Sequence, residues 1–218
     1  DREAPVAIEP PMVKICGVTS AADAATAASL GAWAIGLVFA EESPRHLDLD
    51  QAAEVAGGVS PFTSKVGVFV RPTGDEVRAA VERCGLTLVQ VHGAADIGEL
   101  KEAAGLPVVE VFKVGSVEHL EAARDSPADL VLLDASVPGL EGGTGVAFDW
   151  DLLEQNPIGR SFVLAGGLTP DNVADTIVRL KPTVLDVSSG VEAAPGVKDP
   201  TLIQSFMRGV ALGAERAT

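Results

Sequence analysis

The sequence predicts an α/β protein made of one compact domain, a closed (β/α)8 barrel of the TIM type. Short apolar or β-branched runs alternate with Ala-rich amphipathic stretches eight times along the chain, and such alternation implies parallel strands joined by right-handed crossovers. Runs such as 130–133 are apolar at consecutive positions, as strands covered by helices on one face and closed on the other require. The length of 218 residues fits one domain near the lower size limit of such barrels.

The eight strand-and-helix pairs follow one another in order. The strands are expected at 13–16, 33–39, 65–70, 86–91, 107–112, 129–133, 161–164 and 183–187. The first helix is expected to begin at an N-cap provided by Thr19 or Ser20 and to stop at Gly31. The later helices are expected at about 48–57, 74–84, 95–104, 116–124, 148–154, 170–180 and 199–212.

Residues 1–11 differ from the rest of the chain. They are punctuated by Pro5, Pro10 and Pro11 and lack amphipathic periodicity. We therefore expect a tail or remnant at 1–11, followed by the barrel as the catalytic domain at 12–213.

A doubly wound open sheet is the main alternative. It would usually show a G-x-G-x-x-G motif after the first strand, whereas 16–19 read Cys-Gly-Val-Thr.

Charge and composition restrict the partners. With 31 acidic and 16 basic side chains, the formal charge is 16 − 31 = −15, which disfavours nucleic acid and anionic membranes as partners. No apolar run reaches the roughly 18–20 residues that span a bilayer, and no apolar segment of a signal peptide follows Asp1. Only Cys16 and Cys84 are present, which favours a reducing cytoplasm. We expect a cytoplasmic monomer or homodimer.

Two loops at the ends of neighbouring strands have the composition of a phosphate site. Gly166 and Gly167 follow the seventh strand, with Thr169 as the expected N-cap of the next helix, and 188–190 (Ser-Ser-Gly) follow the eighth strand. Glycines let backbone N–H groups approach a ligand, and helix N-termini favour anions. Barrels commonly bind phosphate at these two loops, so Gly166, Gly167, Ser188, Ser189 and Gly190 are the expected phosphate-binding residues. Alternatively, these glycines simply form tight turns.

Cys16 ends the first strand and is a candidate general base. Because strand side chains alternate between faces, Lys14 and Cys16 are expected to point into the barrel while Val13 and Ile15 point to the helices. An ordinary thiol is only about 3% ionised at pH 7. Lowering its pKa to about 7 requires roughly 2 kcal/mol of thiolate stabilisation, which the Lys14 ammonium is expected to provide. The alternative is a buried structural cysteine, which is our interpretation of Cys84.

Other polar side chains occupy the expected strand ends. Asp134 closes an apolar run, and we expect strands one and six to lie across the barrel from each other, so that Cys16 and Asp134 flank one ligand. The Gly-rich segment 138–145 that follows is typical of a mobile lid.

Arg45 is either a bidentate partner for a substrate carboxylate or a solvated surface residue, and His92 either contacts ligand or is structural. The histidines have no ligand spacing and no cysteine pair supports a zinc site, so no metal is expected.

Taken together, the motifs resemble those of a known family. The motifs are Lys14-Ile15-Cys16-Gly17-Val18-Thr19, Ser43-Pro44-Arg45, Val89-Gln90-Val91-His92-Gly93, Leu133-Asp134, Gly142-Gly143-Thr144-Gly145 with Phe148-Asp149-Trp150, Ala165-Gly166-Gly167-Leu168 and Asp186-Val187-Ser188-Ser189-Gly190-Val191-Glu192. In order over about 13–210, they resemble the phosphoribosylanthranilate isomerases of tryptophan biosynthesis. The resemblance implies a cofactor-free Amadori rearrangement of N-(5-phosphoribosyl)anthranilate to 1-(2-carboxyphenylamino)-1-deoxyribulose 5-phosphate.

The resemblance also implies roles for single residues. Asp134 would be the general acid that opens the furanose ring, Cys16 the general base that takes the C2 proton, and Arg45 the residue facing the anthranilate carboxylate. Gly166, Gly167, Ser189 and Gly190 would fall in the phosphate loops; from their strand-end positions, Lys14, His92 and Asp186 are further expected substrate contacts. One departure is Val146-Ala147, where the family often has Lys-Thr.

Three alternatives remain open. A bifunctional isomerase would also act on the related histidine-pathway aminoaldose, but such barrels normally carry an aspartate where this chain has Cys16. A phosphosugar-binding barrel without catalysis would need only the phosphate loops. A metal-dependent phosphosugar epimerase would lose its activity to a chelator.

Overall fold

The structure, a computed structural model, describes residues 9–93, 96–135 and 150–217. Within these residues, parallel strands pair in chain order and the last pairs with the first, so the sheet closes into a barrel. The barrel strands are β1 (Met12–Cys16), β2 (Ala34–Val38), β3 (Ser64–Val70), β4 (Leu88–His92), β5 (Val108–Lys113), β6 (Leu130–Asp134), β7 (Phe162–Ala165) and β8 (Val184–Val187). The predicted (β/α)8 barrel is confirmed, and the open sheet is excluded.

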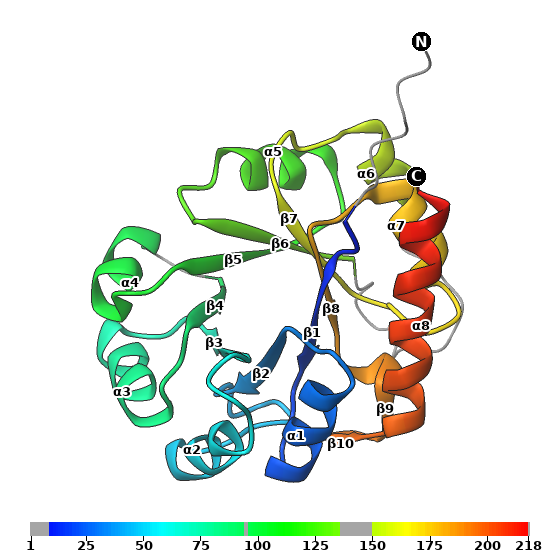
Figure 1. Cartoon of the computed structure of the whole chain (residues 1–218). Coiled ribbons are helices and arrows are strands. Elements are labelled where there is room, and N and C mark those ends of the chain that lie inside the picture. Colours follow the sequence, from blue (N-terminus) through cyan, green and yellow to red (C-terminus); the bar gives the residue numbers. More distant parts are fainter. Residues whose placement is uncertain (1–8, 94–95, 136–149, 218) are drawn as a thin grey trace.

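Figure 1 shows helices arranged around the outside of the strands. They are α1 (Ala21–Ser29), α2 (Leu49–Gly57), α3 (Gly74–Cys84), α4 (Ile97–Ala104), α5 (Val117–Asp125), α6 (Trp150–Gln155), α7 (Val173–Leu180) and α8 (Pro200–Arg216). Helix α2 begins with a reciprocal capping box between Asp48 and Gln51, and α3 begins with one between Thr73 and Glu76. These caps define where the loops at the strand ends finish. No helix within the described segments has both the length and the apolar character needed to cross a lipid bilayer.

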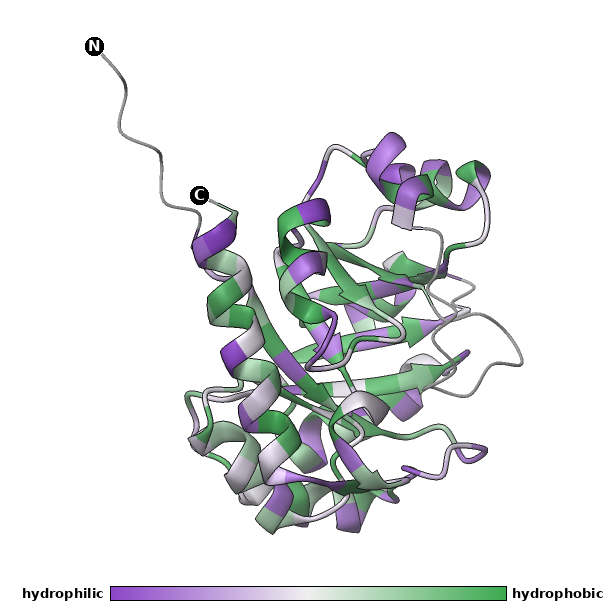
Figure 2. Cartoon of the chain, turned by 90° about the vertical axis from the view of Figure 1, so that its right-hand side faces the viewer, coloured by the Kyte–Doolittle hydropathy of each residue, from purple (hydrophilic) through white to green (hydrophobic). Residues whose placement is uncertain are grey.

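The alternation of side chains divides the core into two parts. The larger cluster lies between strands and helices and includes Val13, Ile15 and Leu133. A smaller cluster fills the barrel interior with residues at alternate strand positions, among them Leu132 and Val184. Figure 2 shows the strands largely in the hydrophobic colour, whereas the helices carry both hydrophobic and hydrophilic residues. The register therefore decides which strand-end side chains reach the mouth of the barrel.

Three details differ from the sequence-based expectations. Helix α7 begins at Val173 rather than Pro170, because the side-chain carbonyl of Asn172 accepts a hydrogen bond from the Thr169 N–H and closes a turn there; the expected N-cap at Thr169 is wrong. Strand β6 lies three strands from β1, through β7 and β8, and not directly across the barrel. After β8 comes a 3-10 turn, η1 (Ser189–Val191), followed by a short antiparallel hairpin, β9 (Glu192–Ala194) and β10 (Val197–Lys198), that was not expected.

Candidate active site

Cys16 and Asp134 both occupy inward positions at the carboxyl ends of their strands. Their neighbours Ile15 and Leu133 pack in the cluster beneath the helices, so strand alternation turns Cys16 and Asp134 to the inner face. His92 ends β4 on the same face. Burial lowers the pKa of the His92 imidazole, and the charge of Asp134 acts on it in the opposite direction. The predicted acid and base therefore share the mouth of one barrel.

A buried ion pair lies just below Cys16. Lys14 Nζ is 2.9 Å from Asp186 Oδ2, and the two side chains are only 5% and 6% exposed. Strand β2 makes room for this arrangement with Gly36, where a Cβ atom would lie 2.8 Å from the Cys16 sulfur. The other carboxylate oxygen of Asp186, Oδ1, is buried and has no hydrogen-bond partner among the described residues. Buried acceptors are nearly always satisfied, so Oδ1 is suited to a ligand hydroxyl.

The pairing of Lys14 with Asp186 overturns the expected activation of the thiol. Burial raises the pKa of Cys16, the charge of Asp186 raises it further, and Lys14 and Lys198 act in the lowering direction without prevailing. Burial is the larger cause, and the negative charge of Asp186 adds to it and opposes the ammonium that was expected to stabilise the thiolate. The prediction that Lys14 brings the thiol pKa toward 7 is therefore wrong in this structure.

Arg45 lies against the β1 loop rather than extending into solvent. A Cβ at Gly17, whose φ is +68°, would come within 2.2 Å of Arg45 Cδ, so only glycine lets the arginine lie so close. The guanidinium donates from Nε and Nη2 to the two oxygens of Glu192, at 2.8 and 2.6 Å, and the Arg45 side chain remains 21% exposed. Arg45 is thus held as one half of a bidentate pair at the mouth.

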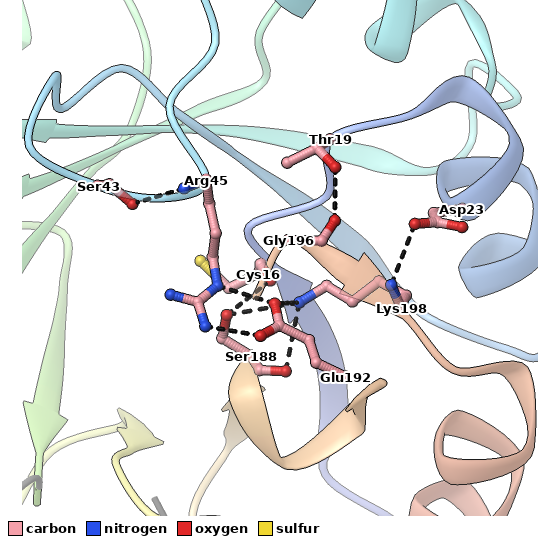
Figure 3. Close-up of polar contacts among 9 residues, drawn as sticks. All are labelled: Cys16, Thr19, Asp23, Ser43, Arg45, Ser188, Glu192, Gly196 and Lys198. Carbon is pink, nitrogen blue, oxygen red and sulfur yellow. Dashed lines mark hydrogen bonds and ion pairs between the residues drawn. The ribbon is translucent and has the colours of Figure 1, made fainter. Parts of the chain in front are cut away.

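Lys198 is a functional candidate that was not expected from the sequence, whereas Glu192 was expected only as the last residue of the segment 186–192 and without a role of its own. Lys198 Nζ is 2.7 Å from Glu192 Oε1, with side chains 1% and 4% exposed, and it also donates to the Ser188 carbonyl at 3.2 Å. Figure 3 shows Arg45 and Lys198 on either side of the Glu192 carboxylate. A signal that could have pointed to Lys198 is its position directly after the apolar Val197 and before the last helix.

The loops after β7 and β8 approach each other closely. A Cβ at Gly190 would lie 1.9 Å from the Leu168 carbonyl oxygen, so the two backbones touch at that position. The Ser188 hydroxyl donates to the Cys16 carbonyl at 3.0 Å, which ties the β8 loop to the end of β1. Gly166 and Gly167 both have positive φ, +91° and +66°. The structure thus brings the predicted phosphate-binding residues together beside Cys16.

Some expectations fall outside what the structure describes. The proposed lid at 138–145 and the Val146-Ala147 departure lie outside the described residues. Within 9–93, 96–135 and 150–217, no group of three or more His, Cys, Asp or Glu side chains is placed to hold a metal ion.

Comparison with known proteins identifies the family. The sequence profile for N-(5'-phosphoribosyl)anthranilate isomerase matches residues 13–209. The Geobacter sulfurreducens N-(5'-phosphoribosyl)anthranilate isomerase is 43% identical over 196 residues, which cover 90% of this chain and 96% of that protein. The solved phosphoribosyl anthranilate isomerase of Thermotoga maritima superposes with a TM-score of 0.84 at 34% identity, covering 92% of this chain and 98% of that one.

A second solved structure carries a ligand. It is a phosphoribosyl anthranilate isomerase in complex with reduced 1-(o-carboxyphenylamino)-1-deoxyribulose 5-phosphate, with a TM-score of 0.80 and 32% identity over 92% of this chain and 98% of that one. Fold, matched residues and relatives all agree. The chain belongs to the N-(5'-phosphoribosyl)anthranilate isomerase family and is an isomerase of tryptophan biosynthesis.

Proposed function

We propose that this chain converts N-(5-phosphoribosyl)anthranilate to 1-(2-carboxyphenylamino)-1-deoxyribulose 5-phosphate without a cofactor, with Asp134 as general acid and Cys16 as general base. The observation that carries the proposal is the strand order. Strands β7 and β8 lie between β6, which ends in Asp134, and β1, which ends in Cys16. A phosphate held by the β7 and β8 loops would therefore place its sugar between the two groups.

The chemistry needs one proton delivered and one removed. Asp134 donates a proton to the furanose ring oxygen, the bond from C1 to that oxygen breaks, and the anthranilate nitrogen forms a Schiff base with C1. Cys16, as the thiolate, then takes the proton from C2, and the electron pair of the C–H bond gives an enolamine. Tautomerisation to the ketone returns the protons, so the reaction is a balanced isomerisation. General acid and base groups typically contribute about 10²–10⁴-fold each.

The remaining mouth residues would hold the substrate. The close β7 and β8 loops, with Gly166, Gly167 and 188–190, would bind phosphate through backbone N–H groups, which suits a chain with a charge of −15. Remote binding of this kind holds the reacting part of the sugar in place.

The sugar and the aromatic ring would meet the other mouth side chains. Asp186 Oδ1, which has no partner among the described residues, would accept a hydrogen bond from a sugar hydroxyl. Arg45 would meet the anthranilate carboxylate, while Lys14 and His92 would line the sugar site. The ligand of the solved relative, a carboxyphenylamino deoxyribulose phosphate, contains the carboxylate, the sugar and the phosphate that this arrangement would bind.

A raised thiol pKa is compatible with this role. Burial and Asp186 make the thiolate scarce at neutral pH, but the base that does form is stronger. The proposed thiol base also requires a reduced cysteine, and Cys16 and Cys84 are both free.

A fluorescence assay with the purified protein tests the proposal. Loss of phosphoribosylanthranilate should be rapid and equally fast with and without a chelator. No turnover above the spontaneous rate would contradict the proposal and favour a binding barrel, and inhibition by chelator would favour the metal-dependent epimerase. Turnover of the histidine-pathway aminoaldose at a comparable rate would show a bifunctional isomerase instead.

A further inference from the structure

Two buried charged side chains at the mouth, Glu192 and Lys198, have no part in the chemistry described above. Lys198 lies on β10, and its position is fixed relative to the β1 strand end. Its backbone N–H donates to the Asp23 carboxylate at 3.1 Å, and the carbonyl of Gly196 in the same hairpin accepts from the Thr19 hydroxyl at 2.5 Å. The β9–β10 hairpin is therefore fastened to the segment that directly follows Cys16 (Figure 3).

Lys198 joins two parts of the mouth through its ammonium group. It donates to the carbonyl of Ser188 at 3.2 Å, and the hydroxyl of Ser188 donates to the Cys16 carbonyl at 3.0 Å. It also donates to Glu192 Oε1 at 2.7 Å. Lys198, whose side chain is 1% exposed, thus holds the β8 loop and the Glu192 carboxylate directly and the end of β1 through Ser188.

Glu192 connects Lys198 to Arg45 by hydrogen bonds. Its Oε1 accepts from both Lys198 Nζ and Arg45 Nε, and its Oε2 accepts from Arg45 Nη2 at 2.6 Å. These contacts hold the Nε–Nη2 edge of the guanidinium and leave the Nη1–Nη2 edge for a second carboxylate. An arginine side chain that is already held in place loses less rotamer freedom when a ligand binds. The planar guanidinium can bind both oxygens of a carboxylate only when the two groups lie in the same plane.

We propose that Glu192 and Lys198 are positioning residues that fix the plane of Arg45 relative to Cys16 and so set the recognition of the aromatic carboxylate. The inference rests on the proposed function, because it concerns the carboxylate end of that substrate. It predicts that Glu192 acts by orienting Arg45. Simple neutralisation of the arginine charge would have the opposite effect on carboxylate binding.

Glu192→Gln tests this prediction with two stable ligands. One is reduced 1-(o-carboxyphenylamino)-1-deoxyribulose 5-phosphate, and the other is the same compound without its carboxyl group. The amide keeps the size of Glu192 but replaces one acceptor oxygen with a donor that faces Arg45 or Lys198. Calorimetry should show that the native protein prefers the carboxylate ligand by about tenfold or more. In Glu192→Gln this preference should fall to about threefold or less, with affinity for the carboxyl-free ligand changed less than about twofold.

Each other outcome would overturn the inference. An unchanged preference would show that Glu192 does not orient Arg45. Tighter binding of the carboxylate ligand would show that Glu192 only neutralises the arginine. Equal losses for both ligands would show a general structural role. Thermal melting by circular dichroism establishes that the variant measured is folded.

Lys198→Met provides a second route if the first variant is unstable. It should lower the carboxylate preference to a similar extent and also weaken the carboxyl-free ligand, because the Ser188 loop loses its ammonium partner. A native carboxylate preference in Lys198→Met would contradict the inference. Lys101→Met is the matched control, since Lys101 forms a surface pair with Asp129 at 2.9 Å and should leave both affinities unchanged.

The two proposals fail separately. If the native protein does not isomerise phosphoribosylanthranilate but Glu192→Gln still loses the carboxylate preference, the proposed function is wrong and the positioning role stands. If the native protein is active but the preference does not depend on Glu192 or Lys198, only the positioning role is wrong.

Discussion

The ion pairs at the barrel mouth and those on the helical surface differ in burial. Lys14 and Asp186 are 5% and 6% exposed, whereas Lys101 and Asp129 are 37% and 40% exposed at the same separation of 2.9 Å. Surface pairs contribute about 0–1 kcal/mol. Buried pairs cost desolvation and often stabilise no better than apolar residues of the same size. The concentration of buried pairs around Cys16 is therefore better explained by function than by stability.

The two groups of pairs also differ in how the chain brings them together. Lys14 and Asp186 are separated by 172 residues, and Arg45 and Glu192 by 147. Lys14 and Asp186 lie on the adjoining strands β1 and β8, whereas Arg45 and Glu192 follow β2 and β8, the two neighbours of β1. Rigid strands hold such groups more precisely than flexible surface side chains do. The mouth pairs can therefore orient groups toward a ligand, and the following predictions test that difference.

The largest expected effect is on catalysis. Cys16→Ser and Asp134→Asn should each lower kcat by about 10²–10⁴-fold, with smaller changes in KM, because each removes a proton-transfer group. Steady-state fluorescence kinetics measures both constants. Cys84→Ser is the matched control, since Cys84 lies at the end of α3 with its thiol toward the Leu49 carbonyl, and its kcat should stay within about twofold. Near-native kcat in either mouth variant would remove that residue from the mechanism.

Breaking the buried pair should have the next largest effect, on stability. Lys14→Met leaves the Asp186 carboxylate buried without its cation, which should lower the free energy of unfolding by about 3–5 kcal/mol. Urea denaturation followed by circular dichroism measures the loss. The double variant with Asp186→Leu removes both charges and should recover most of it. A loss below about 1 kcal/mol in Lys14→Met would show that the mouth pair behaves like a surface pair.

The pH dependence should report the raised thiol pKa. Burial, followed by the charge of Asp186, raises the pKa of Cys16, and the proposed base is the deprotonated form. Below that pKa, kcat/KM should therefore rise with pH, by up to about tenfold per unit. Asp186→Asn removes a negative charge and leaves Lys14 to favour the thiolate, so the rising limb should move to lower pH even where activity falls. A limb that stays in place or moves to higher pH would contradict this account of the thiol.

The smallest effect is expected at the surface. Lys101→Met removes a solvent-screened pair and should change the free energy of unfolding by about 0.2–1 kcal/mol, with native kcat. Chemical denaturation and kinetics on one preparation measure both. A loss as large as that of Lys14→Met would remove the distinction between the two kinds of pair.

The fold was largely predictable because its periodicities are local. Apolar runs and amphipathic helices located all eight barrel strands, and alternation correctly turned Lys14 inward, where it is buried. The start of α7 was missed because the competing turn depends on the side chain of Asn172, which accepts from the Thr169 N–H and donates to the Gly167 carbonyl. Local sequence does not rank such a turn against a Thr–Pro helix start.

The site was less predictable because its electrostatics depend on distant partners. That Asp186 neutralises Lys14, and that Lys198 reaches Glu192, follow from strand register and from the β9–β10 hairpin. Residue type alone suggested a lysine that activates Cys16. The structure shows that the same lysine is paired with Asp186. The direction of the pKa shift of Cys16 therefore depends on its burial and on the position of Asp186, and both are set by the fold.

The most direct test of the central claim, that Asp134 and Cys16 act in successive steps, is the kinetic isotope effect with substrate deuterated at C2. In Cys16→Ser, removal of the C2 proton becomes the slow step, so the isotope effect on kcat/KM should be larger than in the native protein. In Asp134→Asn, ring opening becomes slow, so the effect should disappear. Equal isotope effects in the two variants, or the reverse pattern, would contradict the assignment of Cys16 as base and Asp134 as acid.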